Sequence, residues 1–170
     1  MEIRLAVESD KDVLVPMVNQ VYYSSERDFW ADGYYRLTDN DFDSYLIKDW
    51  LYVLMESEKL IGCVLLKQEE PKVSSFSMLV CHPDHRKQGI GNRLVKFVTE
   101  TAIQRGNTSM NLEILSPKYW EHKEKVFLKR WYMSMGYQLI KEVDFKDYYP
   151  DHMTFMRCEL VFSLYKKSLI

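Results

Sequence analysis

Hydrophobic positions near the start of the chain predict a strand followed by two helices. Residues 2–7 alternate polar and apolar side chains, which is typical of a half-buried strand. A serine and an aspartate at 9–10 can cap a helix after it. The apolar face of that helix would carry Val13, Leu14, Met17, Val18 and Val21. A second helix should begin within residues 38–40 and end near Trp50.

The middle of the chain predicts three strands. Residues 51–55 and 60–67 are apolar runs separated by a polar turn at 56–59, so we expect them to form a hairpin. Pro71 separates this hairpin from a third strand, 74–81.

The last part of the chain predicts a helix, a strand, a second helix and two further strands. The first of these helices follows Gly91 and stops at Gly106. The remaining ranges are 109–115 for a strand, 120–135 for a helix, and 137–145 and 153–165 for the last two strands. This order predicts a mixed α/β or α+β domain, with a largely antiparallel sheet of about seven strands flanked by about four helices.

Composition limits the class of protein. A length of 170 residues fits a single domain over 1–170. The net charge of −2 argues against general affinity for nucleic acid. Cys63, Cys81 and Cys158 match no metal-ligand spacing and suggest a reducing compartment. No apolar stretch reaches the ~20 residues that span a bilayer, and residues 1–4 lack the apolar core of a signal peptide. We therefore expect a cytoplasmic protein without metal, membrane or nucleic-acid partners.

The segment 79–94 carries the clearest chemical signal. An apolar run stops at Pro83, a basic loop with Gly89 and Gly91 follows, and an amphipathic helix then begins. Glycines allow backbone N–H groups to approach a phosphate closely, and a helix N-terminus favours negative charge. This arrangement predicts an anion-binding site.

Residues 86–91, Arg-Lys-Gln-Gly-Ile-Gly, resemble the phosphate loop Arg/Gln-x-x-Gly-x-Gly/Ala of the GNAT superfamily of acyl-CoA-dependent N-acetyltransferases. The segment Tyr132-x-x-x-Gly136-Tyr137 resembles a second signature of that family. A Gly-x-Gly alone would be weak, whereas two signatures with a helix and a strand between them are strong together. The resemblance implies a GNAT-like sheet splayed between strands four and five, here 74–81 and 109–115. It also implies acetyl-CoA as co-substrate.

The resemblance implies roles for backbone groups along the strand and loop. The N–H groups of Leu79, Val80 and Cys81 would bind pantetheine and polarise the thioester carbonyl. The pyrophosphate would be received by Arg86, Lys87, Gln88, Gly89, Ile90, Gly91 and Asn92.

Tyr132 stands where the family often has a tyrosine near the CoA sulfur, so it would donate a proton to the departing thiolate. A packing role is the alternative for this ring. Glu113 is a candidate catalytic base on strand five, although a solvated strand residue has the same pattern. Other candidate bases are Glu26, Asp28, His82, His85 and a relay of water molecules.

Lys125 and Leu128 depart from the family, which often has asparagine and alanine at these positions. Lys125 could contact pantetheine or phosphate, or be an exposed helix charge. Residues 22–36 lie where family members form the acceptor pocket. We expect Glu26, Trp30 and Tyr34 to bind a cationic amine there, unless these rings only cover the core.

The favoured function is transfer of acetyl from acetyl-CoA to a primary amine by direct attack in a ternary complex. The acceptor could be a small molecule, a peptide N-terminus or a lysine, and the protein a monomer or homodimer. The alternative is a CoA-binding sensor with weak or no turnover. A Rossmann-type nucleotide site is excluded because Leu94 occupies the place of the third glycine.

Overall fold

The computed structural model describes residues 1–170 and contains a seven-stranded sheet in the order β1-β2-β3-β4-β5-β7-β6. Its elements are β1 (Glu2–Leu5), α1 (Lys11–Glu26), α2 (Asp39–Ile47), β2 (Leu51–Glu56), β3 (Lys59–Glu70), β4 (Val73–Cys81), α3 (Ile90–Gln104), β5 (Ser109–Pro117), α4 (Lys123–Ser134), β6 (Gln138–Asp144), α5 (Phe145–Tyr148) and β7 (Leu160–Ser168). All neighbouring strands are antiparallel except β4 and β5. The predicted fold class is confirmed.

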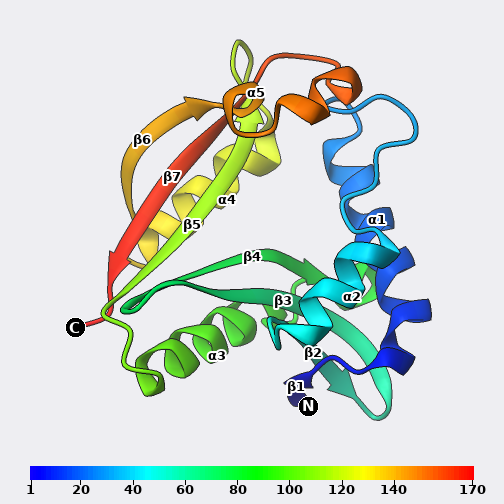
Figure 1. Ribbon diagram of the computed structural model, residues 1–170, viewed down its shortest axis with the longest axis vertical. Helices are drawn as coiled ribbons and strands as arrows, with labels where there is room; N and C mark the ends of the chain where they lie inside the picture. The colour runs from blue at the N-terminus through cyan, green and yellow to red at the C-terminus, as the bar shows by residue number, and fades with distance from the viewer.

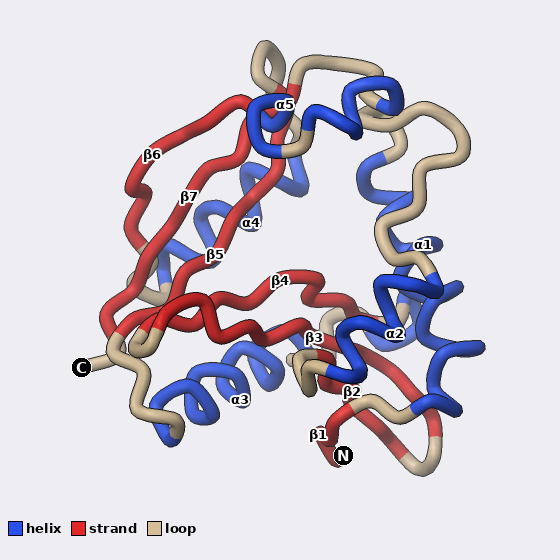
Figure 2. The backbone as a smooth tube through the Cα atoms, in the orientation of Figure 1, coloured by secondary structure: helices blue, strands red, loops and turns tan.

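The sheet divides between β4 and β5. These strands pair only over Val73–Ser75 and Ser109–Asn111, after which they diverge (Figures 1 and 2). Beyond Ser75, the edge of β4 that faces β5 therefore has no strand partner. In Figure 1, α1 runs along the open side of this V, from the lower half-sheet toward the end of the upper one that carries α5. The splay expected from the family resemblance is confirmed.

Alternating residues of the strands face two different cores. One buried cluster joins Leu54, Val64 and Phe76 of the first half-sheet to α3, α4 and Leu112 of β5. A second cluster lies under α1 and α2 and includes Val53. The period-two alternation thus places one set of side chains against α3 and α4 and the other against α1 and α2.

The helix caps agree in part with the sequence. Thr38 caps α2, and its side chain accepts a hydrogen bond from the Asp41 N–H at 3.1 Å. Asp10 occupies the cap position of α1, but its carboxylate instead accepts bonds from the Val7 N–H and the Arg4 guanidinium. These bonds tie the start of α1 to β1.

The last strand differs most from the prediction, because residues 150–155 form a 3-10 turn and β7 begins only at Leu160. The cause is tertiary. Ala31 donates its N–H to the Phe155 carbonyl at 2.6 Å, and Arg157 donates to the Phe29 carbonyl at 2.8 Å. This connection therefore pairs with the loop after α1 rather than with the sheet.

Two predicted helix faces also need correction. Val13 of α1 is 56% exposed and Phe127 of α4 is 65% exposed, although the periodicity placed both on apolar faces. Helix α4 begins at Lys123 rather than at residue 120. Trp120 and His122 precede it and pack edge-on against Phe29.

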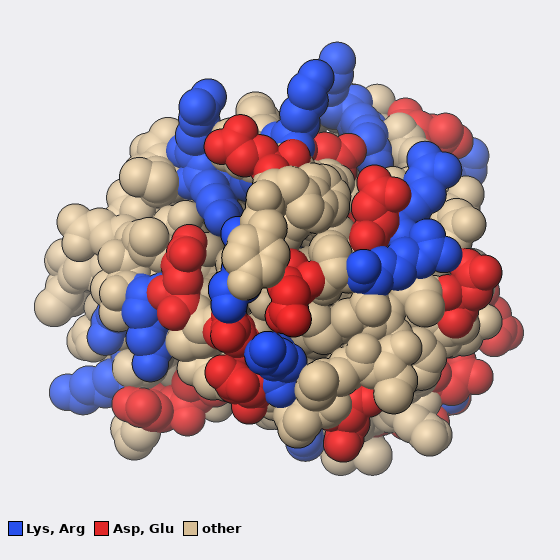
Figure 3. Space-filling view, turned by 90° about the horizontal axis from the view of Figure 1, so that it is seen from above, with Lys and Arg blue, Asp and Glu red and all other residues tan.

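No helix of the structure combines the length and apolar character needed to cross a bilayer. Figure 3 views the end of the molecule that carries α5. Lys and Arg side chains are interspersed there with Asp and Glu, and no single-sign surface covers this face.

Candidate active site

Strand β4 contains an irregularity next to the split in the sheet. Cys63 pairs with Val80 and Leu65 pairs with Ser77, so β4 has one more residue than β3 across this interval. Met78 lies there with a φ of +52°, and its carbonyl accepts a hydrogen bond from the Cys63 thiol at 3.6 Å. A bulge redirects the backbone that follows it. No pattern in the sequence indicates this bulge, since Met is not a residue expected at positive φ.

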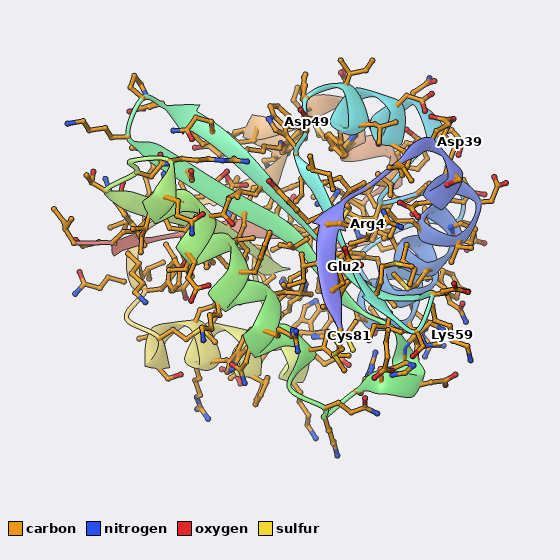
Figure 4. The ribbon with its side chains drawn as sticks, turned by 90° about the horizontal axis from the view of Figure 1, so that it is seen from below. Glu2, Arg4, Asp39, Asp49, Lys59 and Cys81 are labelled. Carbon is orange, nitrogen blue, oxygen red and sulfur yellow. The ribbon has the colours of Figure 1, made fainter.

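The bulge precedes the backbone groups expected to bind pantetheine. Val80 is buried, while Leu79 and Cys81 are half-buried partners of the core under α3. Figure 4 places Cys81 at the end of β4, where the chain leaves the sheet toward the loop before α3. The strand edge and the phosphate loop are therefore consecutive along the chain and meet at the end of the split.

The loop before α3 presents a row of unpaired backbone donors. The N–H groups of residues 87–92 have no hydrogen-bond acceptor within the chain. The backbone is left-handed at Lys87 (φ +63°) and at Gly89 (φ +76°), and Gly89 is the cap residue of α3. Arg86, Lys87 and Gln88 are exposed, and neither basic side chain is held in a salt bridge. Unpaired N–H groups, a helix N-terminus and free cations together suit a phosphate group.

Residues of the core, of α4 and of the turn after β4 pack against the inner side of this loop. Ile90 is buried in the core, and a Cβ at Gly91 would lie 3.2 Å from the Trp131 ring, so α3 packs closely on α4. His82 accepts a bond from the Asp84 N–H at 3.1 Å, and His85 lies 3.7 Å from Glu56. His82 therefore binds the turn after β4, and His85 lies against the end of β2.

Tyr132 lies where the two half-sheets separate. Its ring packs against Phe76, the first β4 residue beyond the pairing with β5, with centroids 5.8 Å apart. The ring is 6% exposed, and burial raises the pKa of the phenol, which therefore stays protonated near neutral pH. Its hydroxyl forms no hydrogen bond within the chain but is not sealed from solvent, unlike that of Tyr137.

Glu113 lies on the other face of β5. Leu112 and Ile114 pack into the core with Tyr132, so the intervening carboxylate points away from them. The Glu113 side chain is exposed to solvent, although many protein atoms surround it. Burial is the main cause that raises the pKa of this carboxyl, with Glu69 adding to it and Lys67 opposing it.

Lys125 and Glu26 lie together in the structure, although the sequence predicted that Lys125 binds the cofactor and Glu26 binds the acceptor. The Lys125 ammonium binds the Glu26 carboxylate, and their side chains are only 10% and 4% exposed. The ammonium also lies 5.7 Å from the centroid of the Phe29 ring. This buried pair joins α1 to α4 across the open side of the split, so Lys125 is not the exposed helix charge that the sequence also allowed.

The three predicted acceptor residues lie together. Trp30 donates its ring N–H to Glu26 at 3.1 Å and stacks on Tyr34 with centroids 4.0 Å apart. All three line a cavity of about 200 Å³ between α1 and the loop to α2. The segment 150–157 closes one side, because Trp30 forms an isolated bridge with Met156. The sequence prediction missed this wall because it placed residues 153–157 in the last strand.

A larger hollow of about 800 Å³ lies between α4 and strands β6 and β7. Its lysines already have partners: Lys118 pairs with Asp144 at 3.0 Å, and Lys129 binds the Ser116 hydroxyl at 3.0 Å. None of the unpaired loop N–H groups lines it, so we place the chemistry at the split instead. No group of three or more His, Cys, Asp or Glu side chains is arranged to hold a metal ion.

Sequence comparison agrees with this geometry. The family model for the acetyltransferase (GNAT) family matches residues 16–123, more than half of the chain. The chain belongs to the GNAT acetyltransferase family. The matched residues include the bulge and the phosphate loop but end before Tyr132. A search among curated protein sequences gives no significant match.

Several solved GNAT structures share the fold. N-acetylglutamate synthase from Neisseria gonorrhoeae, complexed with coenzyme A and N-acetyl-glutamate, aligns with TM-score 0.70 and 17% identity over 99% of this chain and 35% of that one. The chain thus spans about a third of that synthase.

Two further structures match over almost their full length. A putative acetyltransferase from Salmonella typhimurium with acetyl-CoA aligns with TM-score 0.70 and 17% identity, over 100% of this chain and 94% of that one. Ribosomal-protein-alanine N-acetyltransferase from Brucella melitensis aligns with TM-score 0.68 and 17% identity, over 99% of both chains. The names of these relatives indicate different acceptors, so the shared fold leaves the acceptor open.

Proposed function

We propose that this GNAT protein transfers an acetyl group from acetyl-CoA to a primary amine by direct attack in a ternary complex. The observation that carries the proposal is the row of unpaired N–H groups over 87–92, next to the unpaired edge of β4. Phosphate oxygens and pantetheine amides are the ligands that such backbone groups suit.

On the donor side, the loop would receive the pyrophosphate, with Arg86 and Lys87 adding charge. The free edge at Leu79–Cys81 would bind pantetheine and polarise the thioester carbonyl. Backbone donors fixed in place before the reaction stabilise a developing oxyanion effectively. Acetyl-CoA is supported as the donor by the relatives that were crystallised with it or with CoA.

Tyr132 would protonate the departing thiolate. Its buried phenol has a raised pKa, so the proton stays available until the thiolate forms. Glu113 would accept the proton of the attacking amine from the opposite face of β5. Its raised pKa makes it a stronger base than an exposed glutamate, although its ionised fraction falls at low pH.

Lys125 and Glu26 receive a different role from the one their positions in the sequence suggested. Because each is the other's partner, we propose that they hold α1 against α4 and so fix the width of the split. Trp30 and Tyr34 keep the proposed acceptor role, with Glu26 acting through its bond to Trp30.

The test is thiol release from acetyl-CoA across a panel of primary amines, with acetyl-CoA affinity measured separately by calorimetry. We expect saturable, amine-dependent thiol release for at least one acceptor class. Tight CoA binding without release above background for any acceptor would contradict the transferase and favour the CoA sensor.

A further inference from the structure

The cavity of about 200 Å³ beside α1 has an uneven charge arrangement. Each of its two carboxylates already has a cationic partner: Glu26 binds Lys125, and Asp32 lies 3.7 Å from Arg157. Arg27 and Arg36 line the same cavity, and neither forms a salt bridge with a carboxylate of the chain. Arg27 is exposed to solvent, whereas Arg36 is half-buried. The cavity therefore has an excess of positive charge centred on Arg36.

Phenols are the main neighbours of Arg36, and the charge of Glu26, which is already paired with Lys125, also acts on it. Its guanidinium carbon lies 5.3 Å from the centroid of the Tyr22 ring. Burial raises the pKa of Tyr22 and of Tyr34 to about 12, so both phenols are neutral at physiological pH. A guanidinium has five N–H donors, and placing its charge away from water without an anion is costly. The surroundings of Arg36 favour an anion that the chain itself does not supply.

Arg36 also lies above the part of the sheet where the reaction is proposed to occur. Leu37, the residue after Arg36, is buried in the same core cluster as Cys63 and Val80, and the charge of Arg36 opposes the rise that burial causes in the pKa of the Cys63 thiol. Cys63 pairs with Val80 beside the β4 bulge, at the expected thioester position. The charge of Arg36 also acts on Tyr149, on the connection between β6 and β7. In Figure 1 that connection lies beside the loop from α1 to α2, on the open side of the V.

We infer that Arg36 binds a carboxylate of the acceptor, so that the substrate is a small amine carrying a carboxylate group, such as an amino acid. The inference rests on the proposed acetyl transfer and deepens it. The planar fork of a guanidinium matches a carboxylate with two parallel hydrogen bonds. A volume of about 200 Å³ is below the roughly 300–1,000 Å³ of drug-sized sites, so it suits a short end group.

The experiment compares amino acids with their neutral amides as acceptors. The pairs are 3-aminopropanoate with 3-aminopropanamide, and 4-aminobutyrate with 4-aminobutanamide. We expect kcat/KM for the carboxylates to exceed that for the amides by about 10- to 100-fold, the range of a hydrogen bond to a charged group. Arg36→Gln should abolish the preference, and Arg36→Lys should retain part of it. Arg130→Gln, a change at an exposed arginine of α4 outside this cavity, should leave the preference unchanged.

A binding measurement separates this inference from the transferase itself. Calorimetry on the CoA-loaded protein compares N-acetyl-4-aminobutyrate with its amide, and thermal unfolding checks that Arg36→Gln still folds. If that variant is unfolded, Arg36→Lys against wild type carries the comparison. Equal affinity and equal kcat/KM for acid and amide in the wild type overturn the inference. Acid-selective binding that depends on Arg36, without transfer to any amine of the panel, would uphold the carboxylate site and reject the transferase.

Discussion

Replacing Lys125 by methionine tests the buried pair that joins α1 to α4. Methionine keeps most of the length of the lysine stem but removes the ammonium, which leaves the Glu26 carboxylate buried without its cation. The two side chains expose only 10% and 4% of their surface, so water can do little to solvate the orphaned charge. The Trp30 N–H, at 3.1 Å, remains as the one hydrogen bond to this carboxylate.

The expected cost follows from this burial. Removing one partner of a buried ion pair destabilises a protein by about 3–5 kcal/mol, mainly because the remaining charge is uncompensated. For a domain of this size that corresponds to a fall in Tm of roughly 6–20 °C. Lys96→Met is the matched control, since Lys96 and Glu100 lie 3.9 Å apart on α3 and are 77% and 59% exposed. Such exposed pairs contribute at most about 1 kcal/mol, so the control should lose little stability.

Urea unfolding of Lys125→Met, Glu26→Gln and the double variant completes the cycle. Because the double variant leaves no orphaned charge, it should be more stable than the sum of the single losses predicts, with a coupling of about 2–3 kcal/mol. If Lys125→Met unfolds at the wild-type urea concentration, or if the two losses simply add, the pair does not hold α1 against α4.

Three further changes test the donor site and the chemistry. Gly89→Asp should weaken acetyl-CoA binding at least about tenfold by calorimetry, because it adds a carboxylate to the anion site. The control is Gly106→Asp, which changes a glycine of similar left-handed φ and open surroundings and should leave acetyl-CoA affinity unchanged. Tyr132→Phe should lower kcat by about 100-fold or more with little change in KM, whereas Tyr137→Phe removes a buried, unpaired hydroxyl and should keep wild-type turnover. Glu113→Gln should remove the acidic limb of the pH profile of kcat/KM, which lies above the usual glutamate range because the pKa is raised. Folding favours the protonated form of a carboxyl whose pKa is raised, so this variant should be at least as stable at neutral pH. Wild-type acetyl-CoA affinity in Gly89→Asp would refute the phosphate loop. Wild-type kcat in Tyr132→Phe would refute the proton donor, and an unchanged acidic limb in Glu113→Gln would refute the base.

The local structure of the proposed donor site could be predicted from the sequence because short-range rules produce it. A strand that ends at Cys81 just before Pro83, a left-handed Gly89 and an amphipathic helix follow one another in the chain, and each results from short-range backbone preferences. The splay between β4 and β5 came from the family resemblance, since periodicity alone does not show where two strands stop pairing. The bulge at Met78 could not be predicted, because a methionine at positive φ is held there by packing and not by its own preference.

The acceptor half depends on contacts that are distant along the chain. Lys125 and Glu26 are 99 positions apart, and each alone resembles a residue available to a ligand. The segment 150–157 contains apolar residues that resemble a strand, yet its backbone bonds go to residues 29–31. These groups contact one another only in the folded chain, which is why charge and periodicity did not predict the contacts.

The proposed donor loop and the proposed acceptor cavity are supported by different contacts. Ile90 and Trp131 support the loop that we propose binds acetyl-CoA, whereas the cavity beside Arg36 is walled by α1, the loop to α2 and the connection before β7. Two backbone hydrogen bonds join the loop after α1 to the connection before β7, and the Lys125–Glu26 pair joins α1 to α4; none of these interactions contacts the phosphate loop. Acceptor preference can therefore change through residues 22–36 and 150–157 while donor binding stays the same. That separation agrees with the different acceptors that the names of the solved GNAT structures indicate.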